Sequence, residues 1–310
     1  MTHNIMVNHN SASALKAFLE QEGLGMQKKF GQNFLINPGV RQALADALAG
    51  RAGDEAWEIG PGLGAMTALL LEKGLKVKAF EIDFGFIRVL KRFFSNNENF
   101  CLVEGDVMKT WSGEEPPAGS FTGAPFLLGN LPYNIAAALL ADFIEKGRVF
   151  SRMVVVVQKE IAMRMTARAG SPDYSSFSVM CAGSYKAAHL MLIKRASFYP
   201  QPNVDSTGVL LESKNVQAFP AVFYPLVRAL FSSRRKTIKN NLLTFLSSGW
   251  SKFRAMGIDC GVQCTVQELC AAILRENAVK ENERAENLEF EAFLSLAKSI
   301  DNMRIYKQEC

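Results

Sequence analysis

A short polar segment behind an apolar run carries residue types that could hold an amino group on an aromatic ring. Residues 129–133 read Gly-Asn-Leu-Pro-Tyr and directly follow the apolar residues 126–128. Pro132 fixes its own φ and favours an extended conformation at Leu131. The Asn130 side chain and the Leu131 carbonyl then supply two acceptors, and Tyr133 supplies a stacking surface. An isolated segment of this kind is more often an ordinary turn, so its interpretation depends on its neighbours.

A glycine-rich turn is the second candidate for chemistry. Residues 60–64 read Gly-Pro-Gly-Leu-Gly and lie between an apolar stretch at 56–59 and an apolar helical pattern that begins at Met66. Glycines allow the backbone to approach a ligand closely, as in nucleotide-binding βαβ units. Glu81 follows the next apolar stretch, twenty-one residues after Gly60, where an acid can accept hydrogen bonds from ribose hydroxyls.

The elements that position these residues follow a regular alternation. Apolar runs predict strands at 56–59, 77–80, 100–104, 126–128 and 153–157, each separated from the next by a helical pattern or a loop. This rhythm predicts an α/β fold with a parallel sheet covered on both faces. Ligands bind at the carboxyl ends of such strands. Polar or glycine residues end four successive units, and we expect them to form one site: Gly60, Glu81, Asp106 and Asn130.

Length and pattern predict one large and one small domain. The chain has 310 residues, and its first part, 1–27, is polar with a short helix at 11–22. The sheet pattern occupies 28–212. After a polar linker the sequence becomes helical, which predicts a small all-α domain at 213–310. The N-terminus does not resemble a signal peptide, and no apolar run is long enough to predict a membrane span.

Cysteine usage argues against a metal site. The chain has six cysteines, and those at 260, 264 and 270 have neither Cys-x-x-Cys spacing nor a histidine nearby. We therefore expect free thiols in a reducing cytoplasm and no bound metal.

Positive charge gathers in two places on a chain with a net charge of +5. One group lies at residues 159–168, and the other contains Arg234, Arg235, Lys236 and Lys239. Solvated helix faces would explain either group alone. Beside a segment that can hold a base, contact with RNA phosphates is the better explanation for these groups.

The glycine pattern does not choose a cofactor by itself. Gly60, Gly62 and Ala65 also satisfy the dinucleotide fingerprint, so hydride transfer stays open on that ground. The segment at 130–133 has no role in hydride transfer and a clear one in adenine chemistry. Together the two segments resemble the S-adenosylmethionine-dependent adenine methyltransferases.

The resemblance is closer to the ribosomal RNA adenine dimethyltransferases of the kasugamycin-sensitivity type, and it extends from about Lys28 to Ile300. It depends on the order and spacing of seven segments, at 29–35, 58–64, 129–134, 158–160, 198–206, 234–240 and 284–288. It implies a Rossmann-like doubly wound methyltransferase sheet with a small C-terminal all-α domain. The implied activity is transfer of methyl groups from S-adenosylmethionine to the exocyclic amine of adenines in small-subunit (16S) ribosomal RNA.

The resemblance also implies roles for single residues. The S-adenosylmethionine pocket would be lined by Asn33, Leu35, Gly60, Gly62, Glu81, Asp106 and Asn130. Gln32 and Asn33 fit a lid loop over cofactor or substrate. In the chemical step, the Asn130 side chain and the Leu131 carbonyl would accept both amine hydrogens. Tyr133 and Phe198 would clamp the unstacked base, although core packing explains Phe198 equally well.

Two other functions stay open. A large-subunit methyltransferase of the macrolide-resistance type tends to lack Pro61 and often Leu131, and this chain keeps both. A non-catalytic RNA-binding assembly factor would not need Glu81, Asp106 and Asn130 intact. We expect the partner to be small-subunit ribosomal RNA or the immature small ribosomal subunit, bound by a cytoplasmic monomer away from membranes. The N-terminal extension and the stretch near Cys260 depart from the family pattern and carry no predicted function.

Overall fold

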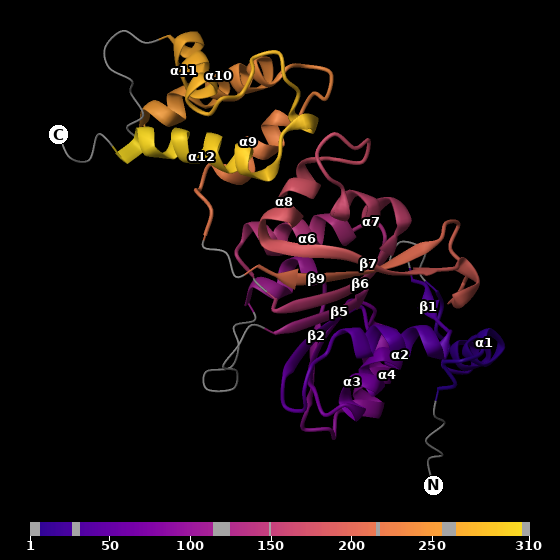
Figure 1. Cartoon of the computed structure of the whole chain (residues 1–310). Coiled ribbons are helices and arrows are strands. Elements are labelled where there is room, and N and C mark those ends of the chain that lie inside the picture. The colour runs from indigo at the N-terminus through magenta and orange to yellow at the C-terminus, as the bar shows by residue number, and fades with distance from the viewer. Residues whose placement is uncertain are drawn as a thin grey trace. The chain divides into compact units, whose positions relative to one another are not determined.

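A computed structural model describes residues 7–26, 32–113, 125–148, 150–214, 218–255 and 265–305 of the chain (Figure 1). The predicted segment at 28–31 and the cysteines at 260, 264 and 310 lie outside these residues. The chain divides into two compact units. The first comprises Met1–Ala162 and Tyr185–Ser213, and the second comprises Met163–Ser184 and Lys214–Cys310.

The first unit is built on a mixed sheet, to which the described residues contribute seven strands in the order β4-β3-β2-β5-β6-β9-β7. The parallel part contains β2 (Glu55–Ile59), β3 (Lys76–Glu81), β4 (Phe100–Glu104), β5 (Phe126–Asn130) and β6 (Arg152–Gln158). These are the five predicted strands, so the α/β prediction is confirmed. Antiparallel β9 (Ser206–Ser213) and β7 (Tyr185–Ile193) extend the sheet beyond β6 and were not predicted.

Helices cover both faces of this sheet, because successive strand residues point to opposite sides. On one face, α2 (Pro38–Ala47) and α3 (Ala65–Glu72) bury Leu44 and Leu70 against Ala56 of β2. On the other, the adjacent Trp57 ring lies 6.5 Å from that of Phe143 in α6 (Ala136–Glu145). Figure 1 shows α2 and α3 on one side of the strands and α6 on the other.

Further elements of the first unit complete the surroundings of the parallel strands. They are α1 (Ala12–Gln21), α4 (Phe84–Phe94), α5 (Val107–Thr110), β1 (Phe34–Leu35) and β8 (Phe198–Tyr199), while α7 (Lys159–Thr166) spans the division between the units. Strands β1 and β8 pair antiparallel as a separate two-stranded sheet. Short strands such as these have no periodicity that a sequence could reveal.

The second unit is helical, as predicted for the C-terminal part. Its helices are α8 (Ser176–Ser184), α9 (Phe223–Leu230), α10 (Ile238–Ala255), α11 (Val266–Glu276) and α12 (Phe290–Ile305). Their apolar faces meet in one core, and the rings of Phe231 and Phe293 stack with centroids 5.7 Å apart. Helix α11 was not predicted, although Thr265 and Glu268 form a capping box at its start.

The structure places residues 163–184 differently from the predicted boundary at 212/213. Helix α8 buries Val179 in the core of the second unit, and the Tyr174 hydroxyl donates to the Leu288 carbonyl at 2.9 Å. These residues follow α7 and precede the sheet strand β7, so their position in the sequence suggested the first domain. The hydrogen bond between Tyr174 and Leu288, which are 114 residues apart in the sequence, places them in the second unit instead.

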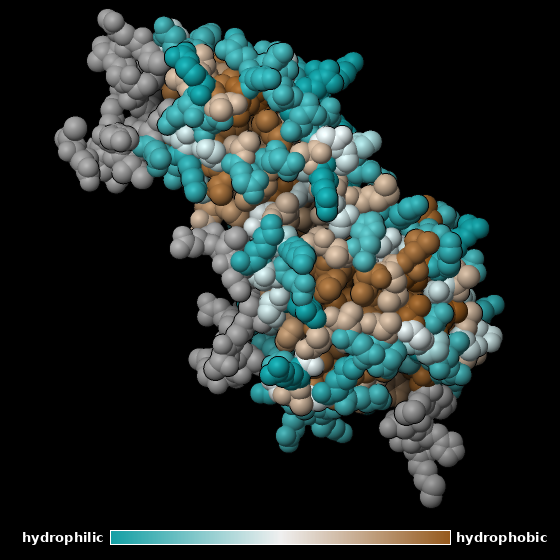
Figure 2. Space-filling view, viewed as in Figure 1, coloured by the Kyte–Doolittle hydropathy of each residue, from teal (hydrophilic) through white to brown (hydrophobic). Residues whose placement is uncertain are grey.

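The surface is mostly hydrophilic, with apolar residues between polar ones on the face shown in Figure 2. Among the described residues, the exposed large apolar side chains are Phe84, Met163, Leu192 and Val204. Within the described ranges, no helix combines the length and apolar character needed to cross a membrane.

Candidate active site

A cavity of about 290 Å³ lies at the carboxyl ends of the parallel strands in the first unit. All seven residues predicted to bind the cofactor contribute to its wall: Asn33, Leu35, Gly60, Gly62, Glu81, Asp106 and Asn130. The strand ends meet here because β4, β3, β2 and β5 are parallel neighbours. The seven residues thus line one cavity, as predicted.

The glycine turn after β2 has a backbone that other residues rarely adopt. Gly60 and Gly62 have φ values of 67° and 59°, in the left-handed region. A Cβ atom on Gly62 would lie 3.0 Å from Cε1 of Phe34. The glycine at this position therefore allows β1 to approach the turn closely.

Glu81 ends β3 as a buried carboxylate held by backbone groups. Its Oε2 accepts from the Gly62 N–H at 3.0 Å, and its Oε1 accepts from the N–H groups of Ile82 (2.9 Å) and Asp83 (2.8 Å). The side chain is 5% exposed, and no cationic side chain among the described residues pairs with it. Burial raises the pKa of Glu81 to about 7, although these hydrogen bonds favour the ionised form.

Glu58 is a second buried acid in the cavity wall, and the sequence analysis gave it no role. Its Oε2 accepts from the Thr67 hydroxyl at 2.6 Å. Burial, with a smaller contribution from the negative charge of Glu81, raises the pKa of Glu58 to about 7. The signal that could have revealed it is an acid inside an otherwise apolar strand, next to the glycine turn.

Asn130 ends β5 with its side-chain amide in a defined orientation. Its Nδ2 donates to the Asn33 carbonyl at 2.7 Å, across 97 residues of sequence. An amide that donates from nitrogen presents its oxygen as the acceptor. The Asn33 carbonyl therefore orients the Asn130 amide, the group that the sequence analysis predicts to accept a hydrogen of the adenine amine.

Asp106 and Gln32 also reach the cavity, and each has a local structural partner. Asp106 caps α5 by accepting from the Met108 N–H at 3.0 Å. Gln32 donates through Nε2 to Asp83 at 3.1 Å, which attaches this part of the chain to the start of α4.

Of the residues predicted to act on the base, Asn130 lines the cavity, whereas Leu131 and Tyr133 do not. Leu131 is buried, and its N–H donates to the Val156 carbonyl at 3.1 Å. The half-buried ring of Tyr133 is held by a 2.6 Å hydrogen bond between its hydroxyl and that of Ser206. Burial raises the pKa of Tyr133 above its ordinary value, so this hydroxyl is neutral at pH 7.

Phe198 is a core residue, as the alternative interpretation of its role predicted. The side chain is 1% exposed and packs with Leu35 and Leu44 in the core. Its backbone pairs with Leu35 between β8 and β1. Because pairing with β1 directs the ring into the core, the prediction that Phe198 clamps a base is not supported in this conformation.

The N-terminal segment, residues 7–26, contributes to the cavity, which the sequence analysis did not predict. Leu15, Phe18 and Leu19 of α1 pack against Leu63 and Phe86. His9 and Leu15 line the cavity, as does Arg41 of α2. No sequence signal marks these residues, because their position depends on how α1 docks.

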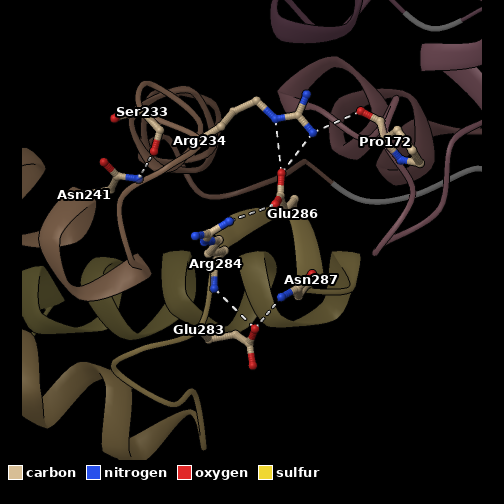
Figure 3. Close-up of polar contacts among 8 residues, drawn as sticks. All are labelled: Pro172, Ser233, Arg234, Asn241, Glu283, Arg284, Glu286 and Asn287. Atoms are coloured by element: carbon tan, nitrogen blue, oxygen red, sulfur yellow. Dashed lines mark hydrogen bonds and ion pairs between the residues drawn. The ribbon is translucent and has the colours of Figure 1, made fainter.

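The predicted RNA-binding segment lies in the second unit, and two of its four cations are paired. Figure 3 shows Arg234 donating through Nε and Nη2 to Glu286, at 3.2 and 2.9 Å, and to the Pro172 carbonyl at 3.0 Å. Lys239 donates to Glu281 at 2.6 Å. Arg235 and Lys236 are exposed.

Asn241 fixes the same segment from inside the helical unit. Its Nδ2 donates to the Ser233 carbonyl at 3.2 Å (Figure 3). It also donates to the Leu230 carbonyl at 2.8 Å. The turn before α10 is thereby held in one conformation, which leaves Arg235 and Lys236 presented to solvent. In the part of the chain that the structure describes, no cluster of three or more His, Cys, Asp or Glu side chains could hold a metal ion.

The fold and the cavity together define a class of protein. A parallel sheet extended by antiparallel strands, a glycine turn after β2, an acid after β3 and Asn130 before Pro-Tyr are the features of an S-adenosylmethionine-dependent methyltransferase with a Rossmann-like fold.

Comparisons with known proteins specify the family. A family model described as ribosomal RNA adenine dimethylase matches residues 23–302. The ribosomal RNA small subunit methyltransferase A of Treponema denticola is 44% identical over 302 residues, which cover 96% of this chain and 97% of that protein. A crystal structure of a dimethyladenosine transferase from Plasmodium falciparum has a TM-score of 0.73 and 27% identity, covering 86% of this chain and 97% of that one.

The 23S rRNA methyltransferase ErmE shares the fold, with a TM-score of 0.59 and 20% identity over 86% of this chain and 99% of that one. This chain belongs to the ribosomal RNA adenine dimethylase family, and it is an S-adenosylmethionine-dependent methyltransferase. Because the Treponema protein aligns with 96% of the chain, most of the N-terminal extension is shared with that relative. The family model begins only at residue 23, so most of the N-terminal extension predicted at residues 1–27 lies outside it, as the sequence analysis expected.

Proposed function

We propose that this enzyme dimethylates the exocyclic amines of two adjacent adenines in small-subunit ribosomal RNA during assembly of the small ribosomal subunit. The relative named for the small subunit, 44% identical over nearly the whole chain, supports this substrate. The likeness to the 23S enzyme, at 20% identity, concerns the fold alone. The free thiols of Cys101, Cys181 and Cys270 accord with action in the cytoplasm, and we propose that the enzyme acts as a monomer.

The cavity suits S-adenosylmethionine on two grounds. Glu81 is a buried carboxylate with no cation beside it among the described residues, so ribose hydroxyls are fitting donors. Gly62 leaves space where a Cβ atom would crowd Phe34. Asn33, Leu35, Gly60 and Asp106 would complete the binding residues. When bound, the cofactor supplies a methyl group activated by its sulfonium.

The single observation that carries the chemical proposal is the hydrogen bond from Asn130 Nδ2 to the Asn33 carbonyl. It turns Oδ1 of Asn130 into a fixed acceptor for one amine hydrogen, and the Leu131 carbonyl would accept the other. An adenine amine is a poor nucleophile because its lone pair is delocalised into the ring. Two acceptors localise that lone pair on nitrogen, and positioning for in-line transfer supplies much of the remaining acceleration.

Tyr133 would hold the unstacked base, since its hydroxyl bond to Ser206 fixes the ring at the end of the Asn-Leu-Pro-Tyr segment. In the helical unit, Arg235 and Lys236 would contact RNA phosphates, while Arg234 and Lys239 hold the segment through Glu286 and Glu281.

Methyl transfer from tritiated cofactor to isolated small and large ribosomal subunits tests the substrate. We expect label in dimethyladenosine of the small-subunit RNA. Label confined to the large subunit would instead identify the macrolide-resistance type.

Single-turnover assays with saturating cofactor and RNA test the mechanism. Asn130→Ala is expected to slow transfer by about 100-fold with little change in RNA affinity, because the acceptor acts in the transition state. Asn99→Ala is the matched control, since Asn99 is exposed and outside the cavity. Parental rates in Asn130→Ala would contradict the mechanism.

A further inference from the structure

Arg41 is a buried cation in the cavity wall to which neither the sequence nor the comparisons assign a role. It lies on the inner face of α2 with Leu44 and Ala45, one turn further along the helix. The side chain is 6% exposed and lines the cavity. Burying a guanidinium is unfavourable unless an anion or several acceptors compensate for its lost hydration.

The partners of Arg41 are neutral oxygens. Its Nη1 donates to the carbonyls of Leu35 at 2.6 Å and His9 at 3.2 Å, and its Nη2 donates to the Asn10 side chain. Among the described residues, no carboxylate lies within ion-pair distance, and the second Nη2 hydrogen and the Nε hydrogen have no partner. A guanidinium has five N–H donors, so two remain for a ligand.

The charges of the cavity are distributed along the strand order. Asp106 follows β4 and Glu81 ends β3, so these two acids lie on the β4 side of the sheet. The third acid in the wall, Glu58 of β2, accepts a hydrogen bond from the Thr67 hydroxyl. Asn33 accepts from Asn130 at the end of β5, and Leu35, two residues further along the chain, accepts from Arg41. Phe34 lies against the glycine turn after β2.

The N-terminal segment adds no positive charge at this end. Burial and the nearby guanidinium lower the pKa of His9 to about 4, so its imidazole is neutral at pH 7. Arg41 is therefore the cation that faces this part of the cavity among the described residues lining it.

We propose that Arg41 binds the carboxylate of the methionyl portion of S-adenosylmethionine, and that residues 7–10, which Arg41 holds, close that end of the cavity. The proposal depends on the proposed function, because it takes S-adenosylmethionine as the cofactor. It assigns His9 and Arg41 to the cofactor site and gives the N-terminal segment a function. Glu81 and Asp106 on the β4 side suit the ribose and adenine, and Arg41 suits the amino-acid carboxylate.

Calorimetric binding of two ligands tests this without RNA or turnover. S-adenosylmethionine and its decarboxylated analogue differ only in the carboxylate. We expect the parent to bind the first at least about 10-fold more tightly, the range for a hydrogen bond to a charged group. Arg41→Met should weaken the binding of S-adenosylmethionine by about 10- to 100-fold. The same substitution should change the affinity for the analogue by less than about threefold.

Two further variants separate a charge effect from a folding effect. Arg41→Lys keeps the charge and should keep most of the preference for the carboxylate. Lys73→Met is the control, because Lys73 pairs with Asp46 of α2 outside the cavity and should leave both affinities unchanged. If Arg41→Met unfolds, the ligand preference of the parent and of Arg41→Lys decides.

Three outcomes would overturn the proposal. Equal affinities of the parent for both ligands would show that no cation of the protein binds the carboxylate. Equal losses for both ligands in Arg41→Met would show that Arg41 only holds the N-terminal segment. Binding of neither ligand by the parent would contradict the proposed function itself.

Discussion

At the residue scale, two buried carboxyls set the behaviour of the cavity with pH. Glu58 and Glu81 both have pKa values raised from 4.5 to about 7, chiefly by burial. The native protein therefore keeps protons on these groups at pH values where the unfolded chain has lost them. Ordered acids of this kind can accept hydroxyl donors without a counter-ion, at the expense of stability in the empty state.

The first prediction concerns stability without cofactor. Because the folded pKa is higher than the unfolded one, this contribution is fully present below pH 4.5 and lost as pH rises through about 7. Each group contributes a loss of about 3 kcal/mol as an upper bound. Thermal unfolding between pH 5 and 8 measures it, and Glu81→Gln should flatten the curve. An unchanged slope in that variant would contradict the assignment.

The second prediction concerns cofactor binding. Ribose hydroxyls donate to the ionised form of Glu81, so binding should release protons and strengthen as pH rises through about 7. Calorimetry in buffers of different ionisation enthalpy counts the protons. Glu81→Gln should reduce the release and weaken binding by about 10- to 100-fold. Equal release in parent and variant would assign the protons elsewhere.

The third prediction concerns the hydroxyl that fixes Tyr133. Tyr133→Phe keeps the ring but loses the bond to Ser206, so we expect a rise of a few fold in the KM for RNA. Tyr133→Ala removes the stacking surface and should weaken RNA capture more, by about 1–3 kcal/mol. Ser206→Ala should raise the KM for RNA as much as Tyr133→Phe does, because it removes the same hydrogen bond. Parental kinetics in all three would exclude Tyr133 from base binding.

At the element scale, the cations of the turn before α10 have two different roles. Arg234 holds the turn in place, and Arg235 and Lys236 are exposed to solvent. Arg234 joins this turn to Glu286 and Pro172, and Asn241 binds the Ser233 carbonyl of the same turn (Figure 3). Asn241 also binds the carbonyl of Leu230 at the end of α9. These contacts lie within the helical unit and order the backbone. Arg235 and Lys236 are left exposed on an ordered support.

The fourth prediction follows from this division. Neutralising Arg235 and Lys236 to Gln should reduce the slope of log affinity against log salt by about 0.9 for each phosphate that the protein no longer neutralises. Arg234→Gln should lower the stability of the helical unit by about 1 kcal/mol at most, because its ion pair with Glu286 is partly exposed. Filter binding at several salt concentrations measures the first effect, and thermal unfolding the second. A slope that is the same in the double variant and the parent would show only a solvated surface.

At the scale of the whole molecule, the chain leaves the sheet unit within α7 and returns to it at β7. Residues 163–184 belong to the helical unit, where Val179 is buried and the Tyr174 hydroxyl binds the Leu288 carbonyl. The sheet unit is therefore discontinuous in sequence. A cut at the predicted boundary would remove the partners of α8 while leaving α8 on the chain.

The fifth prediction tests this division. Deleting 214–310 alone should expose the apolar surface of α8 and lower the soluble yield. Deleting 214–310 and also replacing 163–184 with a flexible Gly/Ser linker of about twelve residues should recover a soluble sheet unit. Soluble yield and cofactor binding measure both. Equal yields would show that α8 does not depend on the helical unit.

The sequence by itself determined the parallel strands and the residues that gather at their carboxyl ends. Apolar runs of strand length are a local property, and parallel neighbours bring their ends together whatever the loops do. For this reason Gly60, Glu81, Asp106 and Asn130 line one cavity, as their spacing predicted.

The tertiary structure alone decided what each side chain contacts. The turning of Phe198 into the core depends on pairing between β1 and β8, and the placement of Arg41 on the docking of residues 7–10. Arg234 is occupied by Glu286, and residues 163–184 join the second core. These outcomes rest on contacts between segments far apart in the chain, which leave no local periodicity. Residues that look alike in the sequence therefore end in the cavity, in the core or on the surface, according to the hydrogen bonds and the burial that the folded state gives them.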